Sequence, residues 1–490
     1  MKKGWTSMSS MKTKLITVGL LALGGCAVGP DYVRPDVSLP SHFKEAGGWR
    51  PAQPADEVLQ GRWWERFGDA QLNALVEQVE ISNLNVRVAE AQFRQAQGVL
   101  GAARAAWLPT LGSNFSATRS QGVSSSTSAA SGSTVTPGAP IRNTDRLSLS
   151  SSWEADIWGR VGRNVEANEA NVAASERDFR AAKLSAQATL VQVYLQLRIN
   201  DAQRRLLDET TKAYRRSLEI TRNRFEAGVA GRVDVAQAET QLRTTEAQAI
   251  DLGIQRAQYE HAIALLLGKA PADLSISATG VLPSLPEVPP SLPSTLLERR
   301  PDVAAAERRV AAANAQIGVA QAAFFPALTL SATGGFQNSS FSNLLSVPNR
   351  FWSLGPGLAL TLFDGGARSA VKEQALAAYD KSVATYRQTV LVAFQEVEDN
   401  LAALRVLAEE AGVQREAANS AAESLRLTGN QYQAGTVSYL NVVTAQASSL
   451  SAERSAIDIV GRRLLASAAL IKALGGGWGA DDPAGTNISQ

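Results

Sequence analysis

Apolar positions recur at helical spacing along two long stretches that contain no proline. The first stretch runs from about Gly162 to Phe225 and the second from about Arg368 to Tyr432. Leu184, Ala188 and Val191 illustrate this spacing in the first stretch. A helix of some 60 residues is a rod of roughly 90 Å, because each residue adds about 1.5 Å. The pattern therefore predicts long helices that pack as rods.

Between the helices lie segments that partly alternate apolar residues with small or polar ones. They cover about residues 110–120, 144–157, 327–337 and 351–363. Each pair of segments follows a proline, Pro109 or Pro326, at which we expect the preceding helix to end. Alternation over about ten residues predicts strands with the length of a tilted transmembrane strand.

The chain contains an internal repeat. Residues 85–111 align without gaps on residues 302–328, and residues 223–238 align on residues 430–445. The spacing differs between these blocks because a Ser/Thr/Gly-rich insertion at residues 119–140 lengthens the first copy. We expect two copies of one plan, in which a helix, two strands and a long helical hairpin follow one another.

Four strands in lipid would form an open sheet whose edge N–H and C=O groups lack partners, at several kcal/mol each. The strands must therefore close into a barrel, and three chains would supply twelve strands, an even number within the known range. The predicted fold class is mixed α and β, with four strands per chain in a shared twelve-stranded barrel and long helices beside it. A soluble sandwich fused to coiled coils is the alternative.

Charge and chemistry exclude several functions. The 48 basic and 46 acidic residues nearly cancel and are interspersed, which argues against nucleic acid as a partner. The histidines, His42 and His261, have no neighbours with ligand-like spacing, and the segment LLLGKAPAD lacks the first glycine and the hydroxyl residue of a phosphate loop. We expect no enzyme activity, no metal and no cofactor.

The N-terminus has the pattern of a signal peptide over residues 1–25. Lys12 and Lys14 precede an apolar run that is too short to cross a bilayer, and two glycines follow this run. Met11 is an alternative start to Met1. We therefore expect export from the cytoplasm.

Cys26, the only cysteine, lies where the sequence resembles a bacterial lipobox. The resemblance implies that its thiol carries a diacylglycerol and its amino group a fatty acid such as palmitate. Ala27 in place of aspartate implies passage to the outer membrane. An incidental thiol in a discarded leader is the alternative.

Several motifs together resemble the outer-membrane factor family of TolC-like exit ducts, in its lipoprotein (NodT-type) branch. They are CAVGPDYVRP, WWERFGDAQLNALV, the repeat prolines, RFEAGVAGRVDV and QYQAGTVSYLNVV. The resemblance covers essentially the whole mature chain. It implies a homotrimer with a twelve-stranded barrel in the outer membrane and a helical tunnel through the periplasm. It also implies passive efflux of drugs or other toxic compounds, delivered by a membrane-fusion adaptor and an inner-membrane pump of the RND type.

The motifs divide the chain into consecutive parts. After the signal peptide we expect a lipidated extended segment (26–62), a first repeat (63–280), a proline-rich connector (281–297), a second repeat (298–475) and a tail (476–490).

The resemblance assigns roles to the two helical turns near Gly228 and Gly435. It implies contact with the adaptor at Ala227, Gly228, Val229, Ala434, Gly435 and Thr436. Glycine suits such turns because it accepts a positive φ. An ordinary turn between helices is the alternative.

The resemblance also implies a periplasmic gate. Its expected residues are Asp234, Tyr432, Leu440, Asn441 and Thr444. Leu440 falls at an apolar constriction that could close by dewetting, with ordinary helix packing as the alternative. Relatives commonly carry acidic residues at the positions of Asn441 and Thr444, so we do not expect a full acidic ring. Some relatives link the positions of Asp234 and Tyr432 across neighbouring helices; Val437 replaces the arginine that completes this network, which predicts a weaker lock.

Two other functions stay open. An exit duct for a type I protein secretion system would share the fold but usually lacks a lipobox. A structural lipoprotein would bind a partner through its coiled coils without conducting anything.

Overall fold

The structure is a computed structural model that describes residues 27–37, 44, 62–121, 141–286 and 300–476. The chain divides into two compact units. The first comprises Met1–Pro35, Arg94–Ala173 and Glu307–Ala384, and the second comprises Asp36–Phe93, Ala174–Ala306 and Thr385–Gln490. Cys26 and His42 lie outside the described residues, so the structure does not test the lipid attachment.

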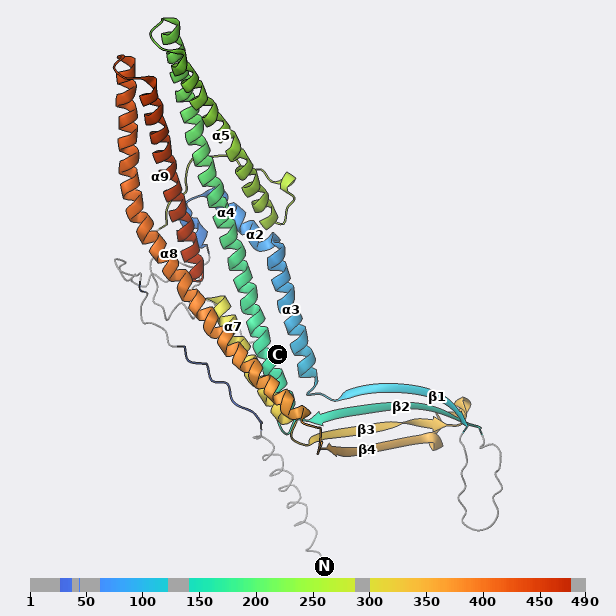
Figure 1. Cartoon of the computed structure of the whole chain (residues 1–490). Coiled ribbons are helices and arrows are strands. Elements are labelled where there is room, and N and C mark those ends of the chain that lie inside the picture. Colours follow the sequence, from blue (N-terminus) through green and yellow to red (C-terminus); the bar gives the residue numbers. More distant parts are fainter. Residues whose placement is uncertain (1–26, 38–43, 45–61, 122–140, 287–299, 477–490) are drawn as a thin grey trace, which may run out of the picture. The chain divides into compact units, whose positions relative to one another are not determined.

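The first unit contains a four-stranded antiparallel sheet in the order β1-β2-β3-β4 (Figure 1). Its strands are β1 (Thr110–Gln121), β2 (Ile141–Ala155), β3 (Ala327–Asn338) and β4 (Arg350–Ala359). All four predicted strands are therefore present. In the described part of the chain β1 pairs only with β2, and β4 only with β3, which leaves β1 and β4 as sheet edges.

Two strand boundaries differ from the prediction by three residues or more. β4 ends at Ala359 and not near residue 363, because Ala359 pairs with Ala327, the first residue of β3. Pro326 precedes Ala327, and a proline has no backbone N–H that could extend the ladder beyond Ala327. β2 begins at Ile141 and not at residue 144, because β1 extends to Gln121, which pairs with Ile141. Strand ends thus depend on the partner strand.

The helices are as long as the apolar spacing predicts. They are α2 (Ala70–Ser82), α3 (Leu84–Ala105), α4 (Arg160–Glu226), α5 (Arg232–Leu266), α7 (Pro301–Ala322), α8 (Ala367–Gln433) and α9 (Tyr439–Ala473). α4 and α8 have 67 residues each, α5 and α9 have 35 each, and α3 and α7 have 22 each. None of the helices that the structure describes combines the length and apolar character needed to cross a bilayer.

The second unit holds two helical hairpins. α5 returns along α4, and α9 returns along α8 (Figure 1). The short helix η3 (Trp63–Phe67) buries Trp63, Trp64 and Phe67 and lies in contact with α2. Asp69 begins α2 by accepting hydrogen bonds from the backbone N–H groups of Gln71 and Leu72 at 2.9 and 3.1 Å. The WWERF motif is therefore part of the core.

Candidate functional site: the helical turns and the sheet

The turn between α4 and α5 is a Schellman motif. The N–H of Val229 donates to the carbonyl of Arg224 at 2.8 Å, and the N–H of Gly228 donates to the carbonyl of Phe225 at 2.9 Å. Gly228 has φ +75°, a conformation that strains any residue with a Cβ. Ala227, Gly228 and Val229 are all exposed. The predicted turn residues are thus available to a partner.

The turn between α8 and α9 has the same geometry. The N–H of Thr436 donates to the carbonyl of Gln431 at 3.0 Å, and the N–H of Gly435 donates to that of Tyr432 at 3.0 Å. Gly435 has φ +77°. Ala434, Gly435 and Thr436 are exposed, like their counterparts in the first turn. Contact with an adaptor at these residues stays a prediction.

Asp234 lies in the first turn of α5, where it caps its own helix. Its Oδ2 accepts a hydrogen bond at 3.2 Å from the N–H of Gly231, the residue that precedes α5. A carboxylate at a helix N-terminus is also stabilised by the helix dipole. Asp234 makes no hydrogen bond to Tyr432 in the described part of the chain, so the structure does not bring these two predicted gate residues together.

Tyr432 lies instead in an apolar cluster that joins the two hairpins. The rings of Tyr432 and Tyr439 meet edge to face with centroids 5.2 Å apart. The cluster contains Tyr214, Leu218, Ala238, Leu242, Tyr432, Tyr439 and Val442, and Val437 packs against it. The Tyr432 hydroxyl is buried and has no partner among the described residues. Tyr432 therefore acts here through its ring.

Two hydrogen bonds connect this cluster to the helix backbones and side chains. The Tyr214 hydroxyl donates to the carbonyl of Gln446 at 3.1 Å, and the Tyr439 hydroxyl lies 3.2 Å from the Ser217 Oγ. Burial raises the pKa of Tyr214 and of Tyr439 above the ordinary value of a phenol. Both phenols therefore stay neutral at physiological pH.

Arg224 is a residue of this site that sequence reasoning missed. Its Nη1 donates to the carbonyls of Tyr432 and Gln433 at 2.9 and 3.0 Å, and its guanidinium carbon lies 4.7 Å from the centroid of the Tyr432 ring. It thus caps the C-terminus of α8 from the neighbouring hairpin. The available signal was its position as a basic residue in the last turn of α4.

Leu440, Asn441 and Thr444 are exposed on α9, and Leu440 has a relative exposure of 55%. The Thr444 Oγ1 donates to the carbonyl of Leu440 at 3.0 Å, one turn back on the same helix. Leu440 and Thr444 share a face, whereas Tyr439 and Val442 are buried. Leu440 is therefore not a packing residue within its own chain, and its role as a constriction stays a prediction.

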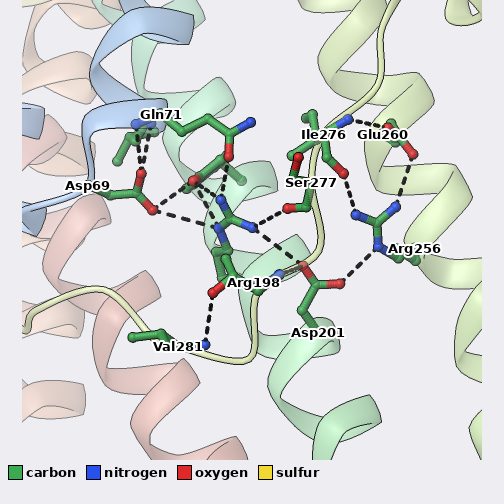
Figure 2. A network of polar contacts seen from close by, with 12 residues as sticks. Asp69, Gln71, Arg198, Asp201, Arg256, Glu260, Ile276, Ser277 and Val281 are labelled. Carbon is green, nitrogen blue, oxygen red and sulfur yellow. Dashed lines mark hydrogen bonds and ion pairs between the residues drawn. The ribbon is translucent and has the colours of Figure 1, made fainter.

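A buried polar network fixes the segment that follows α5 (Figure 2). Arg198, with 2% of its surface exposed, donates to the Gln71 Oε1 at 2.6 Å and to the Ser277 carbonyl at 3.0 Å. Arg256 donates to the Asp201 Oδ1 at 2.9 Å and to the carbonyl of Ile276 at 2.6 Å.

Tyr194 contributes to the same network. Its hydroxyl donates to the Asp69 Oδ2 at 2.6 Å and accepts from Arg198. Burial, together with the hydrogen bond to Asp69, raises its pKa. The donors of Arg198 and Arg256 thus find acceptors within the protein, which indicates a structural rather than a catalytic role.

The sheet has one apolar and one polar face. On one face Phe115, Leu147 and Phe336 are paired across β1, β2 and β3. Leu111, Leu149, Leu330, Trp352, Leu354 and Leu358 lie on this face and are exposed, Trp352 by 77%. The other face carries Gly112, Asn114, Ser116, Ser150, Ser152, Thr329, Ser331, Thr333, Ser353 and Gly355.

The residues just after Cys26, beginning at Ala27, form a strap that packs against other segments of the first unit. The N–H of Val28 donates to the carbonyl of Trp158 at 3.1 Å, and the Asn314 Nδ2 donates to the carbonyl of Pro30 at 2.9 Å. The strap and α7 approach each other so closely that a Cβ at Gly318 would lie 2.9 Å from the Val28 carbonyl oxygen. The strap therefore has a specific seat.

In the described residues, no cluster of three or more histidine, cysteine, aspartate or glutamate side chains has the geometry to hold a metal ion.

The chain matches a family model described as outer membrane efflux protein, over residues 75–269 and 292–476. The chain belongs to this family. The family comprises outer-membrane efflux channels, which are not enzymes, and this chain is an outer-membrane efflux channel component.

Similar proteins agree with this assignment. The chain is 31% identical over 472 residues to the probable efflux pump outer membrane protein TtgC of Pseudomonas putida, covering 96% of each chain. It is 34% identical over 471 residues to the outer membrane protein OprJ of Pseudomonas aeruginosa, covering 94% of each. The solved structure of the outer-membrane channel OprN superposes with a TM-score of 0.83 at 31% identity, covering 92% of this chain and all of the other.

Proposed function

We propose that three copies of this chain form one duct, with a shared twelve-stranded barrel in the outer membrane and a periplasmic tunnel built from the helical hairpins. The observation that carries this proposal is the two-faced sheet. Its apolar face fits lipid and its Ser/Thr/Gly face fits a water-filled lumen. Its two free edges, β1 and β4, need partners inside a membrane, and further copies of the chain supply them.

The paired lengths of the helices support a duct built from two repeats per chain. Each of α3, α4 and α5 has a counterpart of equal length in α7, α8 and α9. The family model also matches twice along the chain. Two equivalent hairpins in each of three chains would surround a pore evenly.

The entrance of the proposed duct lies at the turns after α4 and α8. Leu440 projects from its own chain, so three copies around an axis would narrow the pore with apolar side chains. Asn441 and Thr444 on the same helix are uncharged, so a ring formed by three copies of them would attract cations less strongly than a ring of carboxylates. The exposed turn residues, from Ala227 to Val229 and from Ala434 to Thr436, would meet the adaptor.

Lipid attachment at Cys26 is part of the proposal. The strap begins one residue later, at Ala27, against Gly159, which follows β2. Lipid on Cys26 would thus enter the membrane beside the strands. The anchored protein would lie in the outer membrane and extend into the periplasm.

The proposed cargo is drugs or other small toxic compounds, passed on by a periplasmic adaptor and an inner-membrane pump of the RND type. Relatives named as antibiotic and toluene efflux pump proteins of Pseudomonas putida support this cargo class. The family assignment favours this function over a protein-secretion duct or a non-conducting lipoprotein.

Single-channel conductance in planar bilayers tests the gate. We expect small, mostly closed events from the wild type and larger, longer openings from Leu440→Ala, which removes the apolar side chain, and from Asp234→Ala, which removes the cap at the start of α5. Val413→Ala, at an exposed position of α8 far from the turns, is the control and should match the wild type. An absence of conductance in all four proteins, despite verified insertion, would count against a duct.

A further inference from the structure

The loop between β3 and β4 folds against the apolar face of the sheet. Its helical turn η5 (Phe341–Asn343) places the Phe341 ring edge to face with Phe115 of β1, with centroids 6.0 Å apart. Leu344 is buried behind it, while Phe341 and Leu345 remain exposed by 70% and 67%. Exposure of these apolar side chains to water is unfavourable for a loop.

This fold leaves an apolar groove of about 410 Å³. Phe115 and Leu147 of the sheet form one wall, and Phe341, Leu344 and Leu345 of the loop form the other. The volume falls within the range of roughly 300–1,000 Å³ that is typical of small-molecule sites. Its lining suits a hydrocarbon chain.

A second groove, of about 350 Å³ and polar, shares Phe341 with the first. It is lined by Arg119, Asn143, Asp145, Ser339 and Ser340, among others. In the described part of the chain Arg119 has no ion-pair partner, so its guanidinium is available for a bidentate contact to phosphate. The carboxylate of Asp145 would repel an isolated anion but accepts hydrogen bonds from sugar hydroxyl and amide groups.

We propose that the two grooves form one binding site for a phosphorylated glycolipid of the outer leaflet, with an acyl chain in the apolar groove and the phosphosugar in the polar one. This inference rests on the proposed function, which puts this face of the sheet in lipid. Pairing of β1 with another chain engages its backbone edge and leaves the face open. A basic residue next to an apolar groove at the membrane surface is the general arrangement of lipid headgroup sites.

The occupant follows from the neighbouring charges. Arg350 is exposed on the same face, where it is paired across the strands with Phe336. In the polar groove, Arg119 and Asp145 among hydroxyl and amide groups favour a ligand with both phosphate and sugar over a zwitterionic phospholipid. Arg350 adds a second positive charge elsewhere on the same face.

Native mass spectrometry of the purified protein tests the proposal, with bis-phosphorylated lipid A as the probe and phosphatidylethanolamine as the competitor. We expect the wild type to retain lipid A, and Leu345→Asn and Arg119→Gln each to lower the retained lipid at least five-fold. The matched controls are Val347→Asn, exposed in the same loop but outside the groove, and Arg142→Gln, on the opposite face of the sheet. Both controls should behave as the wild type.

Equal retention by all five proteins would overturn the site, as would equal binding of phosphatidylethanolamine. Retention of dephosphorylated lipid A as strong as that of lipid A would overturn the role of Arg119. Conductance is measured on the same samples. A wild type that retains lipid A without conducting would contradict the proposed duct and leave the lipid site intact, so the two failures are distinguishable.

Discussion

At the scale of single residues, Tyr432 illustrates what its position in the sequence could and could not predict. The family resemblance implied that Tyr432 is linked with Asp234 across neighbouring helices, in a lock weakened by Val437. The structure buries its hydroxyl without a partner among the described residues and packs its ring against Arg224 and Tyr439. Arg224 itself was missed because its contacts depend on how two hairpins lie side by side, which no local pattern records.

Removal of the Tyr432 hydroxyl tests whether this hydroxyl holds the entrance shut. We expect Tyr432→Phe to leave conductance unchanged and to leave the free energy of unfolding unchanged or raise it by up to about 1 kcal/mol, since a buried group without a hydrogen bond is removed. Urea denaturation of the detergent-solubilised protein measures the stability.

Tyr439→Phe is the matched comparison for this variant. Its hydroxyl contacts the Ser217 Oγ, so we expect a loss of about 0.5–1.5 kcal/mol. Larger channel openings in Tyr432→Phe would mean that its hydroxyl holds the entrance through a partner that the single chain does not show.

At the scale of elements, the helices were predictable because local signals end them. α4 and α8 contain no proline and stop at Schellman turns, whose glycines are visible in the sequence. The end of β4 was not predictable in the same way. It is set by the first residue of β3, far away in the chain, so it depends on register rather than on the residues of β4.

The turn glycines give a paired prediction. Gly228→Ala should destabilise the protein by about 1–2 kcal/mol, because φ +75° strains a residue with a Cβ, even though the added Cβ would meet no atom within 4 Å beyond the neighbouring residues. Gly253→Ala, in the interior of α5 with equal space around it, should stabilise by about 0.5–1 kcal/mol. Thermal unfolding followed by circular dichroism compares the two. A loss in both variants would mean that the positive φ of Gly228 does not explain its effect.

Arg300 joins three helices and makes their packing sensitive to acid. It donates to Asp302 of α7 at 2.7 Å, to Glu396 of α8 at 2.6 Å and to the carbonyl of Ala473 at the end of α9 at 3.2 Å. Burial alone would raise the pKa of Asp302, but the hydrogen bonds and charge of Arg300 outweigh burial and lower it.

The lowered pKa determines the sign of the pH dependence. A group with a folded pKa below its unfolded value stabilises the protein above about pH 4, and this contribution is lost as the pH falls through the folded pKa. We expect Asp302→Asn to be less stable than the wild type at pH 7 and to lose less stability between pH 5 and pH 3. Asp273→Asn, at an exposed position, is the control and should follow the wild-type profile. Parallel profiles for wild type and Asp302→Asn would exclude this link.

At the scale of the whole molecule, the proposed duct requires one sheet to meet lipid on one face and water on the other. The alternation that predicted the strands also produces the two faces seen in the structure, because side chains along a strand point alternately to opposite sides. The sequence could not reveal that the loop after β3 folds back onto the apolar face, since that contact pairs Phe341 of the second repeat with Phe115 of the first. In the proposed duct, closure of the sheet by further chains follows from the edges that β1 and β4 leave free in the described part of the chain, and from the cost of unpaired backbone groups in lipid.

Adjacent residues of β2 separate the two faces experimentally. Leu149 lies on the apolar face and is exposed by 56%, whereas Ser150 lies on the polar face. A lysine on the lipid side of a membrane strand costs about 2–4 kcal/mol near the bilayer midplane. We therefore expect Leu149→Lys to reduce the amount of trimer recovered from outer membranes at least five-fold, and Ser150→Lys to assemble normally while shifting the channel toward anion selectivity. Membrane fractionation and reversal potentials measure the two effects. Normal assembly of Leu149→Lys with an altered reversal potential would reverse our assignment of the faces. In that case the lysine would line the pore and the polar face would meet the lipid.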